Sequence, residues 1–246
     1  MHILYRGDRV ERLKAYLCYS TALICVFLFG ALLYISTSDS EITEPVAAQS
    51  KTVFVIDAGH GGEDGGASAN GVLEKDINLA VAQKLRDMLT LSGYEVKMIR
   101  DEDISVYDSD AETVREKKVS DMNNRVHMIN ESTDNVLISI HQNKFEQSKY
   151  SGAQMFYSSN NAQSEKLAES IRSSVTSFLQ PDNKRELKKD DGSVFILKKA
   201  EVPAVIVECG FLSNEEEAKK LSSDKYQGEM AFAIYCGILD WESKRR

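Results

Sequence analysis

From residue 51 onward, short runs rich in β-branched residues alternate with segments of helical periodicity, and this pattern constrains the fold most. The predicted strands are 53–57, 94–100, 135–140, 153–158, 194–197 and 204–208. Several of them are apolar throughout, which is typical of a sheet that is covered on both faces. The sequence therefore predicts one α/β domain. Its mixed, mostly parallel central sheet should have about six strands, with helices on both faces.

Turn and capping residues set the expected limits of these elements. Gly93 should end the first helix, because glycine readily adopts the left-handed conformation found after helix ends. Ser213 and Glu216 fit a capping box that opens a short helix at EEEAKKL. The polar stretches 101–118 and 180–193 are predicted to be surface loops.

The N-terminal segment has the pattern of a membrane anchor. Residues 15–35 carry no charge, and 21 residues at about 1.5 Å each span the roughly 30 Å hydrocarbon core. Basic residues precede this run and acidic residues follow it, which places the N-terminus in the cytoplasm. We therefore expect a basic cytoplasmic segment at 1–14, a transmembrane signal-anchor at 15–35, a linker at 36–50 and a folded domain at 51–246. Val46-Ala47-Ala48 could serve as a cleavage site, so a cleaved, secreted form stays open.

Charge and cysteine content exclude several classes of protein. The net charge is −8 and the pI is about 5.2, so we expect no nucleic acid partner. Four cysteines are too few for a disulfide scaffold. Because no CxxC pair occurs, neither a thiolate zinc knuckle nor a redox pair is predicted.

Four chemically versatile residues lie close to predicted strand ends, where α/β sheets bind their ligands. His60 and His141 follow the first and third strands, Glu208 ends the sixth, and Glu74 follows a glycine-rich loop. Two imidazoles and one carboxylate form the three-ligand set of a catalytic zinc that keeps its fourth position for water. Glu208 is then the candidate that accepts and relays the proton of this water.

Other interpretations of these residues stay open at this point. The glycine-rich loop could cradle a phosphate, although it matches neither phosphate-loop motif. Glu74 could stabilise the start of a helix through the helix dipole. Cys209 could pair with a histidine as a nucleophile, but strand alternation predicts that it faces away from Glu208. His127 is expected to be a surface or half-buried histidine, and Arg125 is expected in structural ion pairs.

The segments that carry a resemblance to a known family are VFVIDAGHGGEDGGASANGVLEKDINLAVAQKL, SIHQN, SGAQMFY and PAVIVECGFLSNEEEAKKL. The chain resembles the zinc-dependent N-acetylmuramoyl-L-alanine amidases of type 3, over about residues 53–240. The resemblance implies a mixed-sheet α/β hydrolase with one catalytic Zn²⁺ and peptidoglycan as its substrate. It assigns His60, Glu74 and His141 as the zinc ligands and Glu208 as the catalytic glutamate. The bond cleaved would join the lactyl group of N-acetylmuramic acid to L-alanine of the stem peptide.

One anchor followed by a bare catalytic domain is similar to the germination-specific spore-cortex amidases of the CwlD type. That likeness implies a membrane-anchored enzyme outside the cytoplasm, a role in muramic-lactam formation, and a lipoprotein activator. Lys144, where relatives commonly have a small residue, could alter the rim of the groove. Two alternatives are another zinc peptidase acting on the stem peptide, and a non-catalytic peptidoglycan-binding protein.

Overall fold

A six-stranded sheet forms the centre of the computed structural model, which describes Ile24 and residues 52–245. The strand order is β4 (Glu95–Met98), β1 (Val53–Ala58), β5 (Asn135–Asn143), β8 (Ala204–Phe211), β6 (Gln154–Tyr157) and β7 (Lys188–Lys189). Strands β4, β1, β5 and β8 run parallel, whereas β6 is antiparallel to β8. The predicted mixed, mostly parallel sheet is confirmed.

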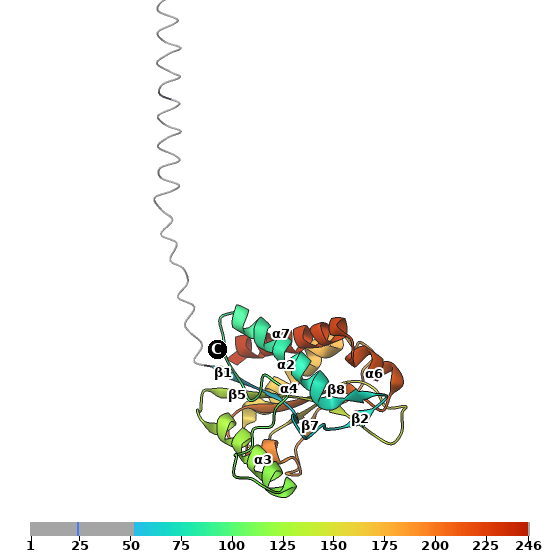
Figure 1. Ribbon diagram of the computed structural model, residues 1–246. Coiled ribbons are helices and arrows are strands. Elements are labelled where there is room, and N and C mark those ends of the chain that lie inside the picture. Colours follow the sequence, from blue (N-terminus) through green and yellow to red (C-terminus); the bar gives the residue numbers. More distant parts are fainter. Residues whose placement is uncertain (1–23, 25–51, 246) are drawn as a thin grey trace, which may run out of the picture. The chain divides into compact units, whose positions relative to one another are not determined.

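Helices cover both faces of this sheet (Figure 1). On one face lie α2 (Glu74–Leu91), α4 (Ala162–Phe178) and α7 (Asp224–Arg245), and on the other lie α3 (Val114–Asn130) and α5 (Phe195–Lys199). Phe54 and Ile56 of β1 belong to the first core, whereas Val55 belongs to the second. The strand is apolar throughout because its side chains enter two cores in alternation.

The prediction of a strand at 194–197 is wrong, because these residues enter α5. The Oδ1 atom of Asp190 accepts a hydrogen bond from the Val194 amide (3.1 Å), just before the helix. Ile196 and Leu197 of this helical turn are buried, and a buried strand would also need apolar residues at these positions. A four-residue apolar run therefore does not distinguish a buried helical turn from a buried strand.

Two short pairings were missed. Strand β7 lies within 180–193, a stretch predicted to be a loop, and it pairs with β6 through its backbone while its two lysines are exposed. The hairpin of β2 (Ser68–Ala69) and β3 (Val72–Leu73) lies between the glycine-rich loop and α2. Strands of two residues show no alternation of polarity, so the sequence pattern contains no signal for them.

Of three predictions about the ends of helices, one is confirmed and two are wrong. Gly93 follows α2 with a φ of +84°, as predicted. The capping box at Ser213 is wrong, because Asn214 caps α6 (Glu215–Leu221) by accepting a hydrogen bond from the Glu217 amide (3.1 Å). Helix α3 begins at Val114, behind a Thr113 capping box, so the predicted loop 101–118 extends too far.

The predicted segments 1–14, 15–35 and 36–50 lie outside the described residues, apart from Ile24. Within the described part of the chain, no helix has the length and apolar character needed to cross a bilayer. Residues 51–246 form a compact unit of their own.

Candidate active site

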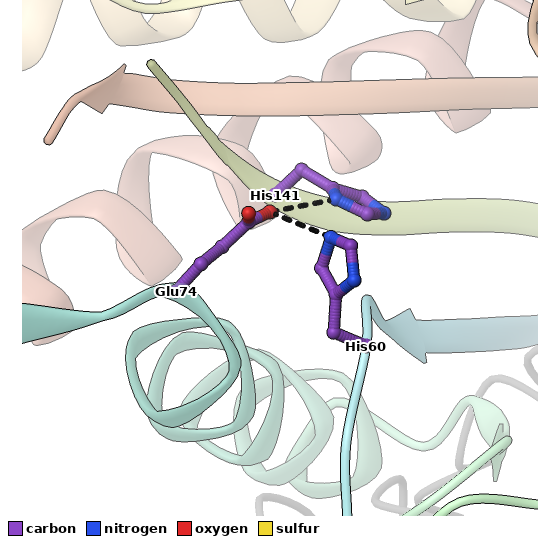
Figure 2. A group of neighbouring side chains, drawn as sticks. All are labelled: His60, Glu74 and His141. Carbon is purple, nitrogen blue, oxygen red and sulfur yellow. Dashed lines mark hydrogen bonds and ion pairs between the residues drawn. The ribbon is translucent and has the colours of Figure 1, made fainter. Parts of the chain in front are cut away.

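Three of the predicted side chains meet at one point beside the sheet (Figure 2). His60 comes from the loop after β1, Glu74 is the first residue of α2, and His141 lies within β5. The Oε1 atom of Glu74 is 2.9 Å from Nδ1 of His141 and 3.3 Å from Nε2 of His60. One ligand atom from each residue lies within 4.8 Å of the others, so this group could hold a single metal ion.

Backbone and amide donors hold the Glu74 carboxylate in place. Its Oε2 accepts a hydrogen bond from the Ala67 amide (2.7 Å), and its Oε1 accepts bonds from the Gln142 amide (3.1 Å) and from Asn78 Nδ2 (3.3 Å). Burial raises the pKa of Glu74, but hydrogen bonds to His141 and His60 outweigh burial and hold the pKa far below its usual range. Glu74 does lie in the first turn of α2, yet the helix dipole does not account for its contacts with two imidazoles.

A second carboxylate orients His60. Its Nδ1 atom lies 3.0 Å from Oδ2 of Asp64, which leaves Nε2 toward Glu74. Burial lowers the pKa of His60, but Glu74 and Asp64 outweigh it and raise the pKa to about 9. For His141, burial also lowers the pKa, and Glu74 and Glu208 again raise it above its usual value. Asp64 was not among the predicted site residues, and its one signal in the sequence is its position four residues after His60.

Close packing accounts for two glycines of the loop. A Cβ atom at Gly59 would lie 2.2 Å from the His141 ring. At Gly66, where φ is +66°, a Cβ would lie 2.6 Å from Glu74 Oε2 and from the His60 ring. The backbone at these positions packs directly on the three side chains, which explains the glycines without a bound phosphate.

Glu208 lies next to this group on the adjacent strand. Its Cα is in register with that of His141 across the parallel pair β5–β8, and both side chains line a cavity of about 290 Å³. The Oε2 atom of Glu208 is covered and has no hydrogen-bond partner among the described residues. Burial raises the pKa of Glu208 to about 7. The negative charge of Glu74 raises this pKa further, whereas the positive charges of His141 and His60 lower it. This carboxyl group can therefore exchange a proton near neutral pH.

Cys209 faces the opposite side of β8, as alternation predicted. It is fully buried in the core under α2, α4 and α7, and its thiol lies 3.7 Å from the Val207 carbonyl oxygen. Burial raises the pKa of this thiol well above its usual value. A protonated thiol turned away from both histidines is unsuited to act as a nucleophile.

Arg125 of α3 connects the second core to the site. Its guanidinium donates to Asp57 Oδ1 (2.5 Å), to Asp121 Oδ2 (2.6 Å) and to the backbone oxygen of His60 (2.9 Å). The predicted ion pairs of Arg125 are confirmed, whereas its bond to the His60 backbone was not foreseen. His127, on the same helix, is exposed as predicted.

Comparison with known proteins agrees with this geometry. A family model described as N-acetylmuramoyl-L-alanine amidase matches residues 54–240. The chain belongs to this amidase family. The match spans the positions of His60, Glu74, His141 and Glu208 and nearly the whole described domain. The protein is thus an N-acetylmuramoyl-L-alanine amidase, an enzyme that acts on peptidoglycan.

Three individual proteins show which amidases this chain resembles. It is 35% identical to the germination-specific N-acetylmuramoyl-L-alanine amidase of Bacillus subtilis, over 91% of this chain and 92% of that protein. It is also similar to the CwlD amidase of Clostridioides difficile, solved in complex with the GerS lipoprotein. That likeness has 41% identity, a TM-score of 0.75, and covers 78% of this chain and 99% of that one. AmiC2 of Nostoc punctiforme is 28% identical with a TM-score of 0.66, over 78% and 98% of the two chains.

Proposed function

We propose that this amidase is a zinc-dependent hydrolase that cleaves the amide between the lactyl group of N-acetylmuramic acid and L-alanine of the stem peptide. The observation that carries the proposal is the convergence of His60, Glu74 and His141 beside the unpartnered carboxyl oxygen of Glu208. Two imidazole nitrogens and one carboxylate oxygen suit zinc, which prefers this mixed set in catalytic sites. Family membership supports the same chemistry.

The residues of the chain have distinct tasks in this proposal. His60, Glu74 and His141 would hold the ion, which supplies Lewis acidity that polarises a carbonyl and lowers the pKa of water. Asp64 accepts a hydrogen bond from Nδ1 of His60 and so keeps Nε2 directed at the site. Glu208 accepts the proton of the attacking water and returns it to the leaving amine of L-alanine. Burial raises the pKa of Glu208 above that of a free carboxyl group, which favours the return of the proton to the amine.

The proposal extends to the setting of the enzyme. The relative named as germination-specific aligns over 91% of this chain, which is more than residues 54–240 alone. We place the catalytic domain outside the cytoplasm, tethered by the anchor at 15–35, with a role in spore-cortex maturation through muramic-lactam formation. The complex of the similar CwlD amidase with a lipoprotein supports a lipoprotein activator here.

The test is a digest of purified peptidoglycan by the full chain in detergent, with elemental analysis of bound metal. We expect new N-terminal alanine and free lactyl groups, and about one zinc per chain. His141→Ala should lose the zinc, Glu208→Gln should keep zinc but lose activity, and the exposed His127→Ala should change neither.

Three results would contradict the proposal, each in its own way. New ends within the stem peptide would identify a peptidase, and no new ends in the presence of an activating lipoprotein would leave a binding protein. Full zinc occupancy in His141→Ala would remove that residue from the ligand set.

A further inference from the structure

A groove leads away from the candidate zinc ligands along α3. The 290 Å³ cavity that holds Glu208 has apolar walls that include Ile206, Phe156 and Met122. A second hollow of about 240 Å³ extends from His60 toward Tyr107. The two hollows share several lining residues, Met122 and Lys118 among them, and so form one continuous surface.

Lys118 of α3 lines both hollows and makes no hydrogen bond or close ion pair with residues 52–245. Its positive charge lowers the pKa of the Asp64 carboxyl group on the facing loop, and the ammonium group keeps all its hydrogen-bond donors for a ligand. Apart from Glu208, the other charged side chains that line the two hollows have partners: Arg125 pairs with Asp57 and Asp121, Lys117 with Glu63, and Asp64 with His60. Lys118 is exposed, so a carboxylate on a bound ligand can reach it.

The proposed reaction, on which this inference rests, fixes which half of the substrate enters the groove. Glu208 returns a proton to the leaving amine of L-alanine, so that amine must lie on the Glu208 side of the ligands. Glu208 lines the hollow with the apolar walls, together with Met122 and Lys118 of α3. The peptide that follows L-alanine would continue from Glu208 toward these residues. N-acetylated glycan carries no charge that could pair with Lys118, whereas the stem peptide carries carboxylates.

We propose that Lys118 determines specificity by binding the free α-carboxylate of the second stem-peptide residue, the γ-linked glutamate after L-alanine. The apolar walls accommodate the alanine methyl group and the glutamyl methylenes, and the ammonium group pairs with the carboxylate. The amidase therefore discriminates against walls in which this carboxylate is amidated. The contact is made in the bound substrate, and so it acts mainly on KM.

Two muropeptides test this inference. They are identical except that the second residue carries an α-carboxylate in one and an α-carboxamide in the other. For the zinc-loaded full chain we expect kcat/KM to favour the acid by about tenfold, mostly through KM. Lys118→Met should bring the ratio close to one, Lys118→Arg should retain the preference, and Arg115→Met, the same charge change on the same helix, should leave the ratio unchanged.

The outcomes separate the inference from the proposed function. If the zinc-loaded wild type cleaves both muropeptides equally well, the role of Lys118 is refuted while the amidase mechanism stands. An unchanged preference in Lys118→Met also refutes it. If neither muropeptide releases N-terminal alanine, the proposed function fails and the inference fails with it.

Discussion

The unpartnered carboxyl group of Glu208 should destabilise the metal-free protein at neutral and alkaline pH. Burial raises its pKa from the ordinary 4.5 to about 7. The difference between these values, at about 1.4 kcal/mol per pH unit, amounts to about 3 kcal/mol. Because the folded-state pKa lies above the unfolded-state pKa, the folded protein is favoured by protonation. This component of stability is therefore full below pH 4.5 and is lost as the pH rises to about 7.

Glu208→Gln isolates this effect, because glutamine is close in shape and cannot ionise. We expect the variant to match the wild type in free energy of unfolding near pH 4.5 and to exceed it by about 3 kcal/mol at pH 8. The assay is urea unfolding of chelator-treated residues 51–246 at a series of pH values, followed by circular dichroism. Asp64→Asn is the control, because it removes the charge of an exposed neighbouring carboxylate. The pKa of Asp64 is lowered, so this variant should not be more stable than the wild type at pH 8. Equal stabilities of wild type and Glu208→Gln at pH 8 would refute the reasoning.

Two further predictions concern the support of the site. Arg125→Met leaves Asp57 as a buried carboxylate without its partner and should cost about 3–5 kcal/mol in urea unfolding at pH 7, part of which Asp57→Asn should restore in the double variant. A loss below about 1 kcal/mol would contradict the buried ion pair. Gly59→Ala places a Cβ against the His141 ring and should weaken zinc affinity on the order of 10- to 100-fold, measured by competition with a chromogenic chelator. Unchanged affinity would show that the ring can move aside at little cost.

The sequence predicted the parts of the fold that depend on burial of long apolar segments. The strands at 53–57, 135–140 and 204–208 are found as central strands, because continuous burial on two faces requires apolar residues at every position. The edges of the sheet were less predictable. Strand β7 consists of two exposed lysines that pair through backbone atoms alone, and such pairing leaves no trace in the side-chain pattern.

The residues of the candidate site could be predicted from the sequence, whereas the contacts that hold them in place could not. Position at strand ends identified His60, His141 and Glu208 as neighbours, and the structure brings them together with Glu74. The bonds that hold them depend on contacts between distant elements, such as the guanidinium of Arg125 on the His60 backbone. No spacing along the chain specifies a contact of this kind, because it exists only after α3 has packed on the sheet.

The three candidate ligands come from the loop after one strand, the start of a helix and the interior of another strand, and these become neighbours only in the folded chain. The unfolded polypeptide therefore has no assembled place for the ion, and loading has to follow folding. Because the cation would bind the native form alone, its free concentration would set part of the enzyme's lifetime against proteolysis.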